Sequence, residues 1–257
     1  MQYQLNILVL VILFTYTLSF KFNNNISIMK TRSSSKISNN KVLSKLNSQN
    51  TNIIPGVGID GCKIESPSKI NTLSEPLQAL IFGLVSLGLY GGTVGLLQVI
   101  SLAEQILPGL MSSWESSWFI LGFFFILAGA AHFTVKKDFV NIYPARGSWG
   151  FWYLPGSPEF HVEWTGVAEL LGGFWLLLGG IGNLGLFTLP SILGNVMQDG
   201  ATALLYLTIV VTPANIYMLT HGAKLPIEGP QVPINFHIIR LAIQCLLFSM
   251  FYKISIM

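Results

Sequence analysis

The sequence has 257 residues, of which 51% are hydrophobic and only 10% are charged, with a formal net charge of +3. An average soluble domain has about 25% charged residues, so this composition excludes an ordinary soluble domain and indicates an integral membrane protein. Cys62 and Cys245 form no Cys-x-x-Cys pair, which argues against dithiol-exchange and zinc-ribbon proteins.

Two segments of different composition come before the first long apolar stretch. Residues 1–19 are signal-like, because their apolar run has the length of a signal-peptide core and is short for a membrane span. Residues 20–60 are transit-peptide-like: between Lys21 and Ile59 there are six Lys or Arg and no Asp or Glu. Together the two segments resemble a bipartite plastid leader, which predicts a plastid membrane, either the thylakoid or the inner envelope. The alternatives are a signal anchor with a disordered basic tail, and a mitochondrial or secretory-pathway membrane.

A linker over residues 61–76 leads into the predicted transmembrane domain, residues 77–257. Five apolar stretches in this domain are long enough to span a bilayer, at about 77–103, 117–135, 163–186, 201–219 and 234–254. The sequence therefore predicts an all-α integral membrane fold with five spans. The connection 136–161 is too polar to span and is rich in aromatic residues. We expect this loop to lie in the headgroup layer, and the alternative is that it covers the entrance to a cavity.

The third span carries an acid, Glu169, about two turns inside an otherwise apolar stretch. Gly166, Gly173 and Gly180 share a helix face with Glu169, so a neighbouring helix can approach closely there. We expect the carboxyl group to point into a helix bundle rather than into lipid. An ionisable group at this depth is a candidate for a functional site.

Polar residues of the other spans are predicted to lie in the same half of the membrane as Glu169, because antiparallel spans alternate in direction. The candidate ligand-binding residues are His132, Glu169, Asn215, His237, Arg240 and Gln244. The last three form a polar stripe along the fifth span. Basic residues in the connecting loops indicate that this side is cytoplasmic or stromal.

Two interpretations of these residues are open. In the first, they form a pocket for a lipophilic small molecule with a polar head, such as a quinone, an isoprenoid, a sterol-like molecule or a lipid. In the second, Glu169 and Arg240 form a structural ion pair that holds the third and fifth spans together, because an unpaired buried charge is costly. No metal site is expected, since His132 and His237 lie on different helices without His-x-x-x-His or Glu-x-x-His spacing. No flavin or phosphate-loop motif is present, and nothing predicts a nucleic-acid partner.

Residues 117–252 contain several motifs in order: Gly129-Ala-Ala-His132-Phe133, Leu154-Pro155, and residues 163–173, 212–218 and 237–244. Together these motifs resemble the DoxX-like family of integral membrane proteins. The resemblance implies a four-helix bundle, to which the first span is an addition, and carries over Glu169, Asn215, His237 and Arg240 as motif residues. In some members it implies association with quinone-linked sulfur oxidation or oxidative-stress complexes.

We therefore expect the membrane subunit of a redox complex that binds a quinone or a similar ligand near the stromal or cytoplasmic leaflet. The alternative is a non-catalytic assembly or accessory subunit of a plastid membrane complex, in which the polar cluster is a structural lock. Whether the chain is itself an enzyme is left open, and any electron transfer would need a partner protein.

Overall fold

The computed structural model describes residues 68–185, 190, 193–223 and 233–257. The predicted signal-like segment 1–19 and transit-like segment 20–60 lie outside the described residues, as does most of the linker 61–76.

The described residues are helical, with no strand among them. The elements are η2 (Ile70–Thr72), α3 (Glu75–Ile106), α4 (Leu110–Glu115), α5 (Trp118–Thr134), α6 (Lys136–Ile142), η3 (Ser148–Gly150), α7 (Pro158–Asn183), α8 (Val196–His221) and α9 (Ile234–Ser255). Five segments are long and apolar enough to cross a membrane: α3, α4 together with α5, α7, α8 and α9. The prediction of an all-α membrane fold with five spans is confirmed.

The ends of the helices follow from local sequence. Helix α7 begins several residues before the predicted span, because Pro158 suits the first helical position and the Ser157 hydroxyl accepts a hydrogen bond of 3.2 Å from the backbone N–H of Phe160. Helix α8 ends at His221 and is followed by Gly222, whose φ of 68° is a left-handed conformation that glycine adopts without strain.

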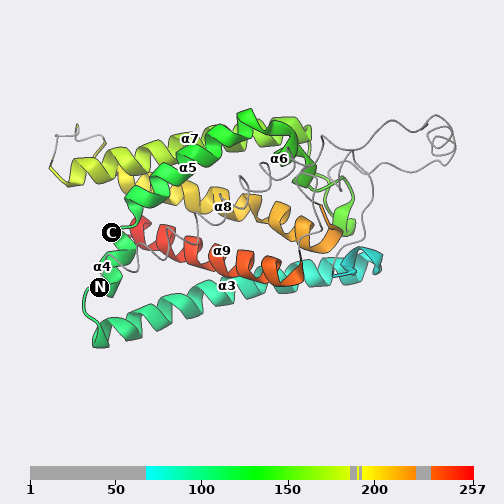
Figure 1. Cartoon of the computed structure of the whole chain (residues 1–257), viewed down its shortest axis with the longest axis horizontal. Helices are drawn as coiled ribbons and strands as arrows, with labels where there is room; N and C mark the ends of the chain where they lie inside the picture. Colours follow the sequence, from blue (N-terminus) through cyan, green and yellow to red (C-terminus); the bar gives the residue numbers. More distant parts are fainter. Residues whose placement is uncertain (1–67, 186–189, 191–192, 224–232) are drawn as a thin grey trace, which may run out of the picture.

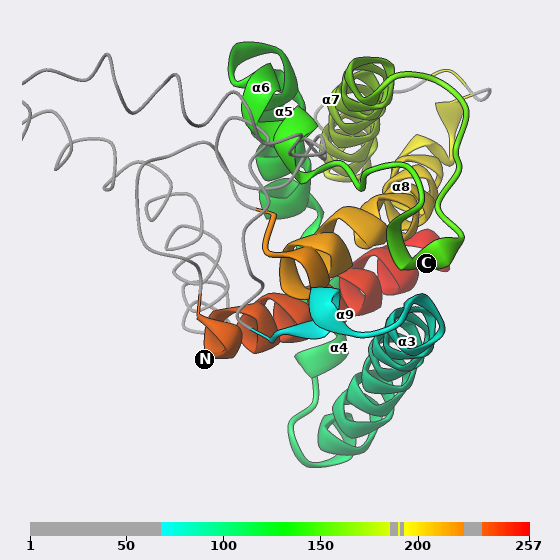
Figure 2. The same cartoon turned by 90° about the vertical axis from the view of Figure 1, so that its right-hand side faces the viewer.

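Helices α5, α7, α8 and α9 form a bundle, and α3 packs on the outside of α9 and against η3 (Figures 1 and 2). A core of side chains from α5, α7, α8 and α9 joins the bundle, and the rings of Phe125 and Phe251 meet there at 5.0 Å. On α3, the side chains of Leu84, Leu87 and Tyr90 are more than half exposed. The peripheral position of α3 agrees with its interpretation as an addition to a four-helix core.

A glycine seam brings α5 and α7 together. A Cβ added at Gly173 would lie 2.7 Å from the carbonyl oxygen of Gly122, and one added at Gly166 would lie 2.6 Å from the Cβ of His132. The prediction that this face of α7 admits a neighbouring helix closely is confirmed. Glu169 lies between these glycines and is only 8% exposed, so it points into the bundle as expected.

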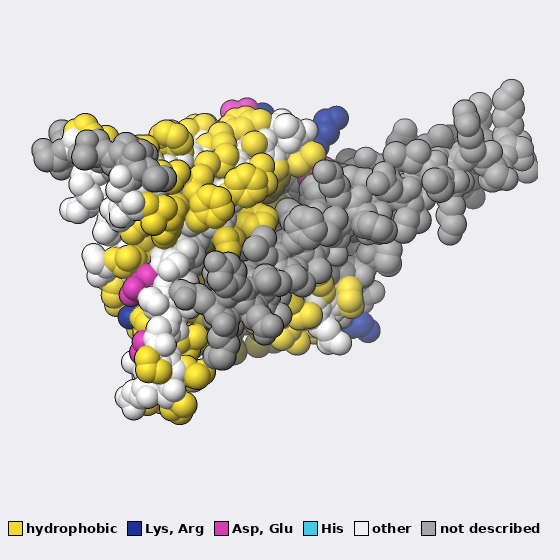
Figure 3. Space-filling view, turned by 60° about the vertical axis from the view of Figure 1, so that its left-hand side comes forward, with side chains coloured by type: hydrophobic (Ala, Val, Ile, Leu, Met, Phe, Trp, Pro, Cys, Tyr) yellow, Lys and Arg dark blue, Asp and Glu magenta, His cyan; other side chains and the backbone are white. Residues whose placement is uncertain are grey.

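The surface suits a bilayer. In Figure 3 the coloured part of the face is mainly hydrophobic, and charged side chains lie toward its margins. The start of α3, the end of α5, the start of α7, the end of α8 and the start of α9 lie at one end of the molecule (Figure 1). This is the alternation that the sequence predicted, and the candidate polar residues belong to that end.

Candidate functional site

A cavity of about 310 Å³ lies among the four helices of the bundle, toward the end just described. Four of the six predicted residues line it, one from each helix: His132 from α5, Glu169 from α7, Asn215 from α8 and Arg240 from α9. Much of the remaining wall is apolar or aromatic, and includes Phe139, Trp152, Trp164 and Val210. The cavity thus combines a small group of convergent polar atoms with an apolar lining, as small-molecule sites do.

His132 and Glu169 face each other across the glycine seam. The His132 Nδ1 lies 2.8 Å from the carbonyl oxygen of Val162, which can only accept, so this nitrogen carries a proton. The other ring nitrogen, Nε2, lies 3.5 Å from the Glu169 Oε2, which is buried and makes no hydrogen bond of normal length. A neutral imidazole opposite a carboxylate would set two lone pairs against each other. The pair avoids this repulsion by holding one proton, either on Nε2 or on the carboxyl group.

Arg240 is bound to α8 rather than to Glu169. Its guanidinium group donates to Asn215 Oδ1 and, over 2.8 Å, to the thioether sulfur of Met218. The structural pair of Glu169 and Arg240 that the sequence suggested is not formed, and this prediction is wrong. The reason is the packing order: α7 lies against α5 and α8, so the acid meets His132, whereas α9 reaches α8.

The remaining predicted residues lie beside the cavity rather than in its wall. Gln244 accepts from the Asn215 amide over 3.3 Å and donates to the Thr212 hydroxyl, which links α8 to α9 below Arg240. It also lines a smaller neighbouring cavity of about 130 Å³ with Arg240. His237, one turn before Arg240, is buried but does not line the 310 Å³ cavity.

The aromatic loop between α5 and α7 closes one side of the cavity. Phe139, Tyr143 and Trp152 line it, and the ring of Phe139 lies 3.9 Å from that of His132. Burial raises the pKa of the Tyr143 hydroxyl above its ordinary value of 10.0, although a hydrogen bond with Trp152 lowers it in part. Tyr143 is therefore an uncharged phenol at neutral pH.

The same loop is anchored deep in the protein by Trp149, which is 1% exposed. Its indole N–H donates over 3.0 Å to the Thr220 hydroxyl of α8, and its ring lies 4.7 Å from that of Phe82 on α3. With Tyr143 and Trp152 in the cavity wall, this anchoring supports the alternative in which the loop covers a cavity. The expectation that the loop also lies in the headgroup layer stays a prediction.

Sequence reasoning missed His161 and Thr165, which also line the cavity. The His161 Nε2–H donates to the Pro155 carbonyl over 2.8 Å and its Nδ1 accepts from the Trp164 indole over 3.1 Å, so this imidazole is neutral. His161, Thr165 and Glu169 follow one another at intervals of four residues. This spacing places them on one helix face and was the available signal.

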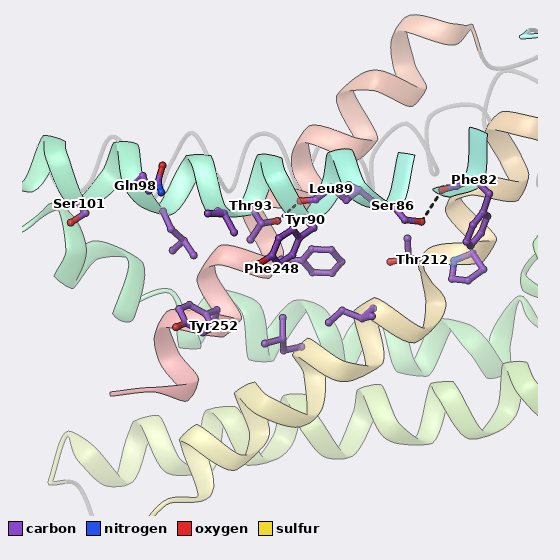
Figure 4. A pocket seen from close by; sticks show the side chains of 15 residues that line it. Phe82, Ser86, Leu89, Tyr90, Thr93, Gln98, Ser101, Thr212, Phe248 and Tyr252 are labelled. Carbon is purple, nitrogen blue, oxygen red and sulfur yellow. Dashed lines mark hydrogen bonds between the residues drawn. The ribbon is translucent and has the colours of Figure 1, made fainter. Parts of the chain in front are cut away.

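A larger cavity of about 730 Å³ lies between α3 and the pair α8 and α9 (Figure 4). Two of its hydroxyl groups are used within their own helix: Ser86 donates to the Phe82 carbonyl over 2.9 Å and Thr93 to the Leu89 carbonyl over 2.7 Å. Pro213 lines both cavities from α8. The larger cavity offers mainly hydrocarbon contacts, so the smaller one is the candidate site.

The described residues contain no group of three or more His, Cys, Asp or Glu side chains that could hold a metal ion. Comparison of the chain with protein-family models, with curated proteins and with solved structures finds no match. The resemblance to the DoxX-like family stays a prediction that rests on the motifs given above.

Proposed function

We propose that this chain is the membrane subunit of a redox complex and binds a quinone, or a similar lipophilic molecule, among α5, α7, α8 and α9. One observation carries the proposal: four polar side chains from four helices meet in one cavity whose other walls are largely apolar. A volume of about 310 Å³ suits a single ring headgroup, at the small end of the usual range for ligand pockets. The tail of the ligand would leave toward the bilayer past Val210, which is 53% exposed.

The polar groups match the chemistry of a quinone ring. Arg240 and Asn215 supply N–H donors for a carbonyl oxygen. The proton held between His132 and Glu169 lies in the same cavity and is available to an oxygen that gains electrons. Reduction of a quinone to a quinol takes two electrons and two protons. In this proposal the electrons come from a partner subunit and one proton comes from this pair. Water at the near membrane surface supplies the second proton and reprotonates the pair.

We also propose a DoxX-like relationship and a plastid membrane as the location. The motifs of residues 117–252 support the first, and the composition of residues 1–60 supports the second. A fluorescent reporter fused to residues 1–60 tests the location. Plastid import is expected, and secretion or a mitochondrial pattern would contradict it.

Binding is tested with the full chain in lipid nanodiscs, titrated with decyl-plastoquinone and followed by tryptophan fluorescence, since Trp152 and Trp164 line the cavity. Glu169→Gln and Arg240→Ala are each expected to weaken binding about tenfold or more, because the first removes the carboxyl group that shares a proton with His132 and the second removes the guanidinium donors. Gln98→Leu, in the larger cavity, is the matched control and leaves binding unchanged. Equal affinity for decyl-plastoquinone in the wild type, Glu169→Gln and Arg240→Ala would contradict the proposal.

A second candidate, an accessory subunit with a structural lock, is favoured by the network of Arg240, Asn215, Gln244 and Thr212 between α8 and α9. In this case Arg240→Ala lowers the free energy of unfolding by about 3 kcal/mol or more, because it leaves buried polar groups without partners. Wild-type amounts of folded Arg240→Ala protein count against the lock. Absence of any quinone binding, together with that loss of stability, favours the lock over the redox subunit.

A further inference from the structure

The charges around the 310 Å³ cavity do not cancel. His132 and Glu169 share one proton, so the pair is neutral whichever group holds it. His161 is held as a neutral imidazole by its two hydrogen bonds, and Tyr143 is an uncharged phenol. Arg240 is the remaining ionisable group in the described wall, and a guanidinium group stays protonated in proteins. The wall therefore carries a net charge of about +1.

Arg240 lacks an anionic partner within the described part of the chain. The ion pairs there are His132 with Glu169 and, at the surface, Lys136 with Glu163 at 2.5 Å. The guanidinium group has instead a neutral amide oxygen and a thioether sulfur, which is a weak acceptor. Arg240 is 8% exposed, so water offers it little compensation. A buried cation with such partners is costly unless an anion joins it.

We infer that the cavity accepts an amphiphile with a singly charged anionic headgroup, whose negative charge pairs with Arg240. The inference rests on the proposed function, from which it takes the position of the site. It restricts the class of ligand from any lipophilic molecule with a polar head to one whose head is an anion. Two sources share this chemistry: a quinone whose ring carries an acidic hydroxyl group, and a lipid with an acidic headgroup. The neutral pair of His132 and Glu169 beside Arg240 places a hydrogen-bonding group next to the charged one.

The test compares two pairs of ligands on the full chain in nanodiscs of neutral phosphatidylcholine, with empty nanodiscs as the blank. The first pair is 2-hydroxy-3-alkyl-1,4-naphthoquinone, an anion at neutral pH, and its uncharged 2-methyl analogue. The second pair is dodecyl phosphate and dodecanol. In at least one pair the anion is expected to bind about ten- to a hundredfold more tightly than its neutral analogue, as a charged hydrogen bond in a buried site implies.

The outcomes separate the two proposals. A preference for the hydroxyquinone supports both the inference and the quinone function. A preference for dodecyl phosphate without binding of either quinone supports the anionic headgroup and contradicts the quinone function. Equal or tighter binding of the neutral member in both pairs overturns the anionic headgroup, and binding of the neutral quinone then leaves the quinone function standing. Absence of binding by all four ligands overturns both.

Three variants test whether Arg240 is the residue that causes the preference for the anionic ligand. Arg240→Gln keeps an amide that can donate hydrogen bonds and is expected to abolish the preference, whereas Arg240→Lys keeps the charge and retains it in part. Lys137→Gln removes an exposed positive charge near the same end and leaves the preference unchanged. Loss of preference in Lys137→Gln would overturn the assignment to Arg240. If Arg240→Gln does not fold, the comparison of ligands on wild-type protein still decides the inference.

Discussion

Glu169 is kept in the interior by a close approach of two helices. His132 lies on the facing helix, with its Nε2 3.5 Å from the carboxyl group, and Gly166 leaves no side chain between them. The Nδ1 of His132 is fixed by the Val162 carbonyl on α7 itself, so the imidazole has one orientation. A small residue, an imidazole and a carboxyl group thus form one unit at the site.

Gly166→Ala is expected to disturb this unit. The new Cβ would lie 2.6 Å from the Cβ of His132, which belongs to the helix-proximal, least flexible part of that side chain. Helices α5 and α7 must move apart, which lowers the free energy of unfolding by about 1–3 kcal/mol. Thermal unfolding in detergent measures the loss. The control Gly91→Ala has no neighbour within 4 Å and keeps or slightly raises stability, so equal behaviour of the two variants would contradict the seam.

The loop over residues 143–157 covers one side of the 310 Å³ cavity and is held in place by one side chain. Trp149 adopts a φ of 57°, a left-handed conformation that is rare for a residue of its size. It keeps this conformation because its ring is packed between α3 and α8 and its N–H is bound to Thr220. Trp149 therefore connects the loop to the peripheral helix α3 and to helix α8 of the bundle.

Trp149→Ala is expected to free the cover from the bundle. Removal of a fully buried indole costs about 3–5 kcal/mol, through the lost contacts and the space left behind. Limited proteolysis of the loop becomes faster and the melting temperature falls. Tyr153→Ala, a change at an exposed aromatic residue in the same loop, serves as the control. Equal proteolysis of the two variants would show that Trp149 does not anchor the loop.

The sequence predicted where the polar residues lie along the membrane normal but not which of them touch. Alternating spans of known length place His132, Glu169, Asn215 and Arg240 at one end, since depth follows from residue number along a helix. The order of helices around the bundle depends on side-chain packing, which no pattern within one helix reports. The partner of Glu169 was therefore mistaken. The anchoring of the aromatic loop was missed for a similar reason, because Thr220, the partner of Trp149, is 71 residues away in the chain.

Lys and Arg side chains are concentrated at one end of the described bundle, and this asymmetry predicts the orientation of the protein in the membrane. Lys69, Lys136, Lys137 and Arg146 belong to the end that carries the cavity, whereas Lys253 lies near the other end. Short loops rich in Lys and Arg stay on the cytoplasmic or stromal side. We therefore predict that the cavity end lies on the cytoplasmic or stromal side, where the partner subunit of the proposed redox complex would also have to deliver its electrons.

This direction is tested by labelling single cysteines in intact bacterial cells that express the chain. In a Cys62→Ser and Cys245→Ala background, Glu159→Cys marks the exposed start of α7 at the cavity end, and Ser116→Cys marks an exposed position after α4 at the other end. A membrane-impermeant maleimide is expected to label Ser116→Cys in intact cells and Glu159→Cys only after permeabilisation, because the basic loops hold the cavity end inside. The reverse pattern would place the cavity on the opposite side. A redox partner would then have to be sought in the lumen or outside the cell.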